Sequence, residues 1–224
     1  MDASTTSDKN PRTHGLSERV TQFRALIGRY PVTIAITAIV AAVGLATQDN
    51  SGAQMARLMA RYGMTWPDLK ELRLWTLPVS TVMQSDPGFP WIILFFVLTS
   101  LLALEFLGGS LAAAVTFLAA DWISSPLTEV ALKILAMFGS HEAHGLLTIG
   151  STGSSAAFHG AFAAGAMLLP PRWSRLLVSI MLGVVVFQFI FERLDNAVAH
   201  AIATFIGAVL ARYVWRPAAE QPEA

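Results

Sequence analysis

Two residues of this chain, Ser155 and His200, are of the types that carry out acyl-transfer chemistry. A serine hydroxyl is a weak nucleophile until a base removes its proton, and histidine titrates in the range that suits such a base. A hydroxyl–imidazole pair could therefore hydrolyse a peptide bond. The alternative is that Ser155 bonds the backbone of its own helix while His200 is simply packed in the core. The choice depends on the elements that hold the two residues.

The composition of the 224 residues is that of an all-α integral membrane protein. Hydrophobic residues make up 54% of the chain and charged residues only 13%, whereas soluble domains carry about 25% charged residues. Basic and acidic residues number 15 each, which argues against a nucleic-acid partner because such proteins need a basic surface. Cysteine is absent, which excludes disulfides, thiolate metal sites and a cysteine nucleophile.

Six apolar segments are candidates for membrane-spanning helices, which need roughly 20 mostly apolar residues. They are residues 31–47, 90–107, 109–123, 154–170, 176–191 and 196–214. The third, fourth and sixth segments are rich in small residues, which suit close helix packing in lipid. We predict a disordered cytoplasmic tail over 1–30, a six-helix membrane domain over 31–214 and a short C-terminal tail over 215–224.

Basic residues predict the orientation of these spans, because cytoplasmic loops are enriched in them. Nine of the fifteen fall in the N-terminal tail, between the fourth and fifth segments, or at the C-terminal end: Lys9, Arg12, Arg19, Arg24, Arg29, Arg172, Arg175, Arg212 and Arg216. This pattern predicts a multi-pass protein with both termini in the cytoplasm. The long first loop then lies outside, and its residues 54–62 have the spacing of an amphipathic helix, either interfacial or covering the bundle.

Polar residues inside a membrane span are costly, so each is a functional candidate. We expect Glu105, near the inner end of the second segment, to cap or lock a helix junction. Asp121, near the outer end of the third, is expected to contact a loop or a helix terminus. Ser155 lies in the first turn of the fourth segment and His200 about one turn into the sixth. At 1.5 Å per residue both lie within about 10 Å of the outer boundary.

Small residues recur every four positions in the fourth and sixth segments. They are Ala156, Gly160 and Ala164 in one and Ala199, Ala203 and Gly207 in the other. Such stripes let two helix backbones approach closely. Since His200 lies three residues before Ala203, it projects from the same side of its helix. The spacing therefore predicts a contact that brings the imidazole onto the serine hydroxyl.

Residues 153–160, GSSAAFHG, resemble the nucleophile segment of the rhomboid intramembrane proteases, and residues 195–207, DNAVAHAIATFIG, resemble their sixth helix. Weaker similarities cover RLWT at 73–76 and LEFLGGS at 104–110. The resemblance implies a six-transmembrane-helix rhomboid-like bundle with Ser155 as nucleophile and His200 as general base. It also implies supporting roles for the neighbouring motif residues Gly153, Ser154 and Gly160. His159 falls where the family commonly has an aromatic side chain stacked on the catalytic histidine; simple core packing is the alternative.

Two positions depart from the family pattern. Ala156 replaces the glycine that follows the nucleophile. The histidine and asparagine that stabilise the oxyanion in the second helix are also missing, because those places fall on Phe89 and Ile93 in one register and on Phe96 and Ser100 in the other. His141 or His144, in the segment SHEAHG before the nucleophile, could supply the missing oxyanion donor. The alternative for this segment is a solvated polar loop.

Three functions follow from these observations. The resemblance implies a serine protease that works in the lipid bilayer, needs no metal or other cofactor, and cleaves transmembrane proteins entering between the second and fifth spans. A catalytically inactive rhomboid-like protein that binds transmembrane helices is the alternative, favoured by the missing pair. A transporter using Glu105, Asp121 and His200 as an ion path is the third, but the sequence shows no internal repeat of the kind transporters have.

Overall fold

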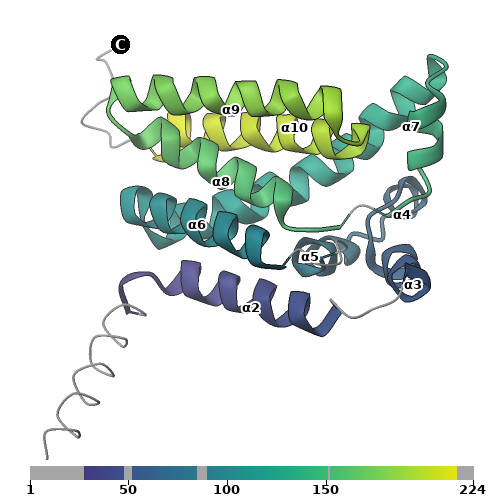
Figure 1. Cartoon of the computed structure of the whole chain (residues 1–224), viewed down its shortest axis with the longest axis horizontal. Coiled ribbons are helices and arrows are strands. Elements are labelled where there is room, and N and C mark those ends of the chain that lie inside the picture. Colours follow the sequence, from purple (N-terminus) through teal and green to yellow (C-terminus); the bar gives the residue numbers. More distant parts are fainter. Residues whose placement is uncertain (1–27, 48–51, 85–89, 151, 216–224) are drawn as a thin grey trace, which may run out of the picture.

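The computed structural model describes residues 28–47, 52–84, 90–150 and 152–215, and every secondary-structure element within these ranges is a helix. Figure 1 shows α8, α9 and α10 lying lengthwise beside one another, α2 running along the far side of α6, and the short helices α3, α4, α5 and α7 toward one end. The bounds are α2 Pro31–Thr47, α3 Gly52–Tyr62, α4 Trp66–Lys70, α5 Thr76–Val82, α6 Pro90–Met137, α7 His141–Leu146, α8 Ser155–Leu168, α9 Pro171–Phe191, α10 Leu194–Leu210 and the π-helix η1 Ala211–Trp215.

All six apolar segments predicted from the sequence lie in helices. Three helical stretches of the described chain are long and apolar enough to cross a membrane: Leu94–Met137, Pro171–Phe191 and Leu194–Trp215. The helices α2 and α8 are apolar but shorter. The all-α prediction therefore holds for the described residues, and membrane-spanning character is supported for three helices. The predicted tail over 1–30 lies outside the described residues except for its last three, as does the C-terminal tail beyond residue 215.

The helix α6 consists of two apolar halves joined at Gly109, whose φ of 84° and ψ of 170° interrupt the helix. Glycine adopts such a positive φ without steric cost, so the chain turns between the second and third predicted segments within a single residue. The second half continues to Met137, well past the predicted end at residue 123. One face of this far part is packed, because Leu132 forms a core cluster with Ala143 and Leu146 of α7.

The helix α8 is the centre of the bundle. Nine of its 14 residues are buried, and it packs against α6, α9 and α10. The helix α9 is peripheral by the same measure, because only three of its 21 residues are buried. A polypeptide whose outer helix is almost wholly apolar and exposed is suited to a lipid surrounding rather than to water.

The tightest helix contact joins α8 to α10. A Cβ placed on Gly207 would lie 2.0 Å from the carbonyl oxygen of Gly160, and a Cβ on Gly160 would lie 2.2 Å from the Cβ of Ala120 on α6. The two backbones therefore touch directly, as the small-residue spacing predicted. Ala156, Ala199 and Ala120 extend the contact as a buried cluster.

The carboxylate of Glu105 joins three parts of the chain. It accepts hydrogen bonds from the backbone N–H groups of Val32 and Thr33 at the start of α2, from the Thr33 hydroxyl at 2.6 Å and from the Ser110 hydroxyl at 2.7 Å. A negative charge at a helix N-terminus is favourable. The expectation that Glu105 locks a helix junction is thus met: it caps α2 and bridges the Gly109 turn of its own helix.

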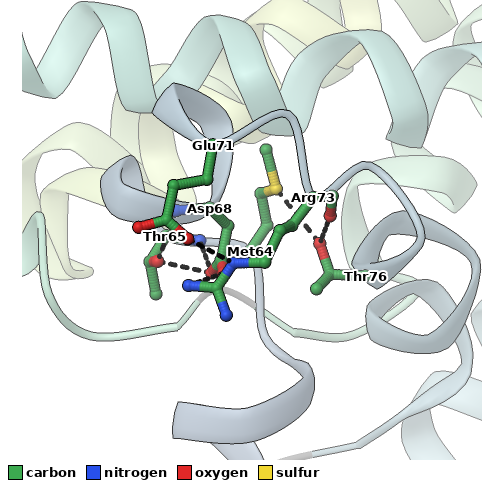
Figure 2. Close-up of polar contacts among 6 residues, drawn as sticks. All are labelled: Met64, Thr65, Asp68, Glu71, Arg73 and Thr76. Carbon is green, nitrogen blue, oxygen red and sulfur yellow. Dashed lines mark hydrogen bonds and ion pairs between the residues drawn. The ribbon is translucent and has the colours of Figure 1, made fainter.

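The first-loop helices are held by a compact polar cluster, which Figure 2 shows. Thr65 and Asp68 form a capping box that starts α4. The guanidinium of Arg73 lies 2.9 Å from the Asp68 carboxylate and 3.1 Å from that of Glu71. This places a buried carboxylate and a cation at the end of the bundle where α8 begins, and gives the segment RLWT a structural role. The amphipathic helix predicted over 54–62 is α3, with Met55 buried.

The glycine contact between α8 and α10 generates a stability prediction. We expect Gly207→Ala to lower the stability by about 1–3 kcal/mol, the usual cost of forcing extra atoms into a packed core, because the new Cβ meets backbone that cannot rotate away. Thermal unfolding in detergent or nanodiscs measures the change.

Gly183→Ala is the matched control, since Gly183 lies in α9 and a Cβ placed on it would have no atom within 4 Å. There the gain in helix propensity is about 0.5–1 kcal/mol in favour of alanine. Equal melting temperatures for the two variants would contradict the direct backbone contact.

Candidate active site

Ser155 is the first residue of α8 and follows a turn that is fixed in place. Gly153 has a φ of 113°, which requires glycine, and its N–H donates a 2.8 Å hydrogen bond to the carbonyl of Ser80 in α5. The first-loop helix α5 therefore positions the turn, and the turn positions Ser155. The backbone N–H groups in the first turn of any helix have no acceptor within the helix, so α8 presents such donors beside the hydroxyl.

His200 lies in α10, is 5% exposed and packs face to face on His159 of α8. The two ring centroids are 3.9 Å apart and the ring planes differ by 9°. Neither ring nitrogen of His200 has a hydrogen-bond partner among the described residues. Stacking, rather than a hydrogen bond to a third group, therefore sets the orientation of this imidazole. Of the two alternatives for His159, the structure shows stacking.

His159 is itself fixed by two hydrogen bonds. Its Nδ1 lies 2.8 Å from the carbonyl oxygen of Ser155, one turn earlier in the same helix. Because a carbonyl only accepts, Nδ1 carries the hydrogen. Its Nε2 lies 3.4 Å from the side-chain nitrogen of Gln188 in α9, which donates. His159 is thus held as a neutral ring with one defined tautomer.

Two cavities lie where these helices meet, and both Ser155 and His200 line each of them. The smaller holds about 10 Å³, the space of roughly one water molecule, and Asp121 and Asn196 also line it. The larger holds about 730 Å³, within the ~300–1,000 Å³ usual for ligand sites. It extends between the first half of α6 and α9, where Phe96 and Met181 are among its apolar walls.

The structure brings Ser155 and His200 to shared cavities without joining them directly. No hydrogen bond connects the Ser155 hydroxyl to His200 within the described residues, and both nitrogens of that ring are unpartnered. Hydrogen bonds between catalytic groups are often long in unliganded sites and tighten when the substrate binds. The pairing of these two residues stays a prediction, to which the structure adds a common site.

The remaining motif residues have structural positions. Gly160 belongs to the contact with α10. Ser154 is fully buried, and its hydroxyl accepts a 3.2 Å hydrogen bond from the side-chain amide of Gln84. Neither residue lines the two cavities.

His141 and His144 do not fit the role of oxyanion donors. The segment SHEAHG is not a loop but the helix α7, capped by the Ser140 hydroxyl, and both histidines are exposed on it. Neither lines the smaller or the larger cavity. The helix forms because Ala143 and Leu146 bury one face against the second half of α6, which turns the polar face and its histidines outward.

The first half of α6 provides no side-chain amide at the site. Phe96 and Ser100 line the larger cavity together with Ser155, so the register that places the family's histidine and asparagine on these two residues brings them to the site. In the other register, Phe89 and the side chain of Ile93 lie outside what the structure describes. The Ser100 hydroxyl donates to the carbonyl of Phe96 at 2.7 Å. The pair is replaced by an aromatic ring, stacked on Phe158, and by a hydroxyl engaged with its own helix.

The two carboxylates expected to have roles inside the predicted spans, Glu105 and Asp121, occupy different places. Asp121 accepts a hydrogen bond from the Thr81 hydroxyl of α5, and Trp122 donates to the same hydroxyl at 3.1 Å. The expectation that Asp121 contacts a loop or a helix terminus is met, because Thr81 lies in the last turn of α5. Glu105 lines neither cavity and is committed to α2, so Glu105, Asp121 and His200 do not form a continuous ion path.

Sequence reasoning missed Gln84, Gln188 and Asn196, which all line the larger cavity. Two of them could have been recognised as candidates from the sequence. Gln188 is a lone amide in the apolar run of α9, which is costly in a span, and Asn196 lies one turn before His200 on the same helix face. Gln84 follows α5 in a loop, where a polar residue is ordinary, so only the structure reveals it.

Comparison with protein-family models, with curated proteins and with solved structures finds no match for this chain. Within the described ranges no group of three or more histidine, aspartate or glutamate side chains could hold a metal ion. The function therefore has to be argued from the geometry of the site.

The His159 hydrogen bonds generate a spectroscopic prediction. In protein labelled with ¹⁵N-histidine, we expect His159 to give the shifts of a neutral ring protonated at Nδ1 and bare at Nε2. The chain has five histidines, so the His159→Phe variant assigns the signal. A ring protonated at Nε2, or at both nitrogens, would mean that the Gln188 amide presents its oxygen instead and would refute the assigned tautomer.

Proposed function

We propose that this chain is a rhomboid-like intramembrane serine protease that cleaves transmembrane proteins. The observation that carries the proposal is the convergence of Ser155 and His200, 45 positions apart in the sequence, on the same two cavities. The resemblance of the segments around each residue to the rhomboid nucleophile and general-base helices adds to it. Nucleophile and base are brought together by the α8–α10 backbone contact, as this chemistry requires.

In the proposed reaction the Ser155 Oγ attacks the carbonyl carbon of the scissile peptide bond, and its proton passes to His200. The tetrahedral intermediate collapses as the carbon–nitrogen bond breaks, and His200 returns the proton to the leaving amine. Water then attacks the acyl-enzyme, giving one proton to His200, which reprotonates Ser155 as the ester breaks. The reaction as written uses no metal ion or organic cofactor.

The stacked His159 ring holds the His200 imidazole in place for this reaction. At 3.9 Å between ring centroids, the His159 ring covers one face of His200. In serine proteases with a triad, a carboxylate orients the histidine and stabilises its charge. Here a neutral ring fixed by Gln188 and by the backbone would take over the orienting part.

We further propose that all six apolar helical segments cross the bilayer: α2, both halves of α6, α8, α9 and α10. At 1.5 Å per residue, α8 is only about 21 Å long, shorter than the ~30 Å hydrocarbon core, so its N-terminus and Ser155 would lie below the outer surface. Basic residues flank three helix ends: Arg29 precedes α2, Arg172 lies at the start of α9, and Arg212 follows α10. These three helix ends lie at the same end of the bundle in Figure 1. Basic residues gathered at one end support a cytoplasmic location for it.

The larger cavity suits a segment of a substrate's transmembrane helix. It lies between the first half of α6 and α9, where the resemblance implies that substrates enter, and α9 is the least buried of the long helices. Its apolar walls match an apolar substrate, while Ser155, His200 and Asn196 add polar groups to the lining. An unwound peptide beside these groups would have its backbone within reach of the hydroxyl.

A catalytically inactive rhomboid-like protein that binds transmembrane helices is the second candidate. Two observations favour it: no hydrogen bond joins Ser155 to His200 among the described residues, and Phe96 and Ser100 stand where the family has its oxyanion pair. Such a protein would use the same cavity to hold a helix without cleaving it.

Labelling by a fluorophosphonate probe in nanodiscs tests the proposed protease. We expect the wild type to be labelled and both Ser155→Ala and His200→Ala to lose labelling by at least about 10³-fold, the scale seen when a member of a nucleophile–base pair is removed. Ser179→Ala and His144→Ala, exposed on α9 and α7, are the matched serine and histidine controls and should be labelled like the wild type.

Two results would overturn the protease. A wild type that stays unlabelled while it still binds transmembrane helices would favour the inactive protein. Labelling that survives in Ser155→Ala would place the nucleophile elsewhere.

A further inference from the structure

The proposed reaction needs hydrogen-bond donors for the oxyanion that forms on the attacked carbonyl. Such donors are usually the largest single contribution to this chemistry, and the loss of one costs about 10²–10³ in rate. The first turn of α8 supplies backbone N–H groups. The first half of α6 lines the larger cavity with Phe95, Phe96, Thr99 and Ser100, none of which carries an amide. The two hydroxyls among them donate to carbonyls of their own helix. A side-chain amide therefore has to come from another element.

Gln84 lies beside the turn that precedes Ser155, because its side-chain amide donates a hydrogen bond to Ser154. It follows the end of α5 and is 6% exposed, so its amide is buried beside the turn that carries Ser155. Its Nε2 lies 3.2 Å from the Ser154 hydroxyl oxygen and 3.4 Å from the carbonyl oxygen of Val82. Because the Val82 carbonyl can only accept a hydrogen bond, the nitrogen of the Gln84 amide, and not its oxygen, faces Val82 and Ser154.

The amide of Gln84 lies against the turn that precedes Ser155. Its nitrogen donates to the Ser154 hydroxyl, and a Cβ placed on Gly153 would lie 3.5 Å from its oxygen. Gln84 and Ser155 both line the larger cavity. The amide is therefore held beside the residue that precedes the proposed nucleophile, in the wall of the cavity that a substrate would enter.

The present hydrogen bonds of Gln84 are exchangeable. At 3.2 and 3.4 Å they lie beyond or at the long end of the usual range for N–H donors, and both acceptors are neutral. A bond from the same N–H to an oxyanion is shorter and roughly twice as strong. The donor is thus held in place in the resting protein by weak bonds that the developing charge can replace.

The two other amides at the cavity are less suited to this role. Gln188 donates to His159 and serves the histidine stack. Asn196 lines both cavities with Ser155, but it is exposed and lies on α10, one turn before the proposed base His200. We propose that the side-chain amide of Gln84 is the oxyanion donor of this site, in place of the missing pair on α6. This inference rests on the proposed protease function.

The rate of phosphonylation by the fluorophosphonate probe measures the donor directly, since the attack of Ser155 places negative charge on the phosphoryl oxygen. We expect Gln84→Met and Gln84→Glu to lower the limiting rate of labelling by about 10²-fold and to leave the probe concentration at half-saturation within about threefold. The methionine variant removes the donor without adding charge, and the glutamate variant keeps the shape. His144→Ala is the control, and thermal unfolding identifies folded protein for each variant.

Three outcomes would overturn the inference. Wild-type limiting rates in both folded Gln84 variants would do so while leaving the protease intact, provided that labelling still depends on Ser155. A fall in rate in Asn196→Ala with none in Gln84→Met would move the donor to α10. Absence of Ser155-dependent labelling in the wild type would remove the proposed function together with the donor.

Discussion

The direct backbone contact between α8 and α10 is the constraint on which the site depends. Two glycines, Gly160 and Gly207, bring the helices so close that neither position has room for a methyl group. The contact fixes the lateral distance between the helices, and the starting points of α8 and α10 then place Ser155 and His200 at the same cavities. A wider helix separation, of the kind that larger side chains impose, would pull the imidazole away from the serine turn.

The elements of this fold that follow from local sequence were predictable, and those that depend on tertiary contacts were not. Apolar segments long enough to be helices became helices, and the four-residue spacing of small side chains predicted the α8–α10 contact. The second half of α6 was predicted too short because its polar stretch looks like a loop until α7 packs on Leu132. The same packing made a helix of the segment carrying His141 and His144 and turned both outward.

At the site, the two candidate residues Ser155 and His200 were chosen from their types and depth, but their surroundings were not predicted. A spacing argument cannot place Gln84, because tertiary hydrogen bonds join α5 and the residues after it to the turn before Ser155, from Gly153 to Ser80 and from Gln84 to Ser154. It also cannot reveal that His200 lacks any polar partner among the described residues and is oriented by a stacked ring. Burying an imidazole with two unpartnered nitrogens carries a desolvation penalty. A hydrogen bond from a water molecule or from the Ser155 hydroxyl would reduce that penalty.

The peripheral position of α9 has a consequence for how this protein is handled. One wall of the larger cavity is a helix with only three buried residues, so the neighbours of that wall are whatever molecules surround the protein. Lipids with acyl chains of different length impose a different hydrophobic mismatch on an exposed helix. A detergent micelle surrounds that helix differently from a bilayer. The shape of the cavity therefore depends on the solubilising medium as well as on the chain. Small molecules selected for binding in micelles would fit a different cavity wall from those selected in vesicles.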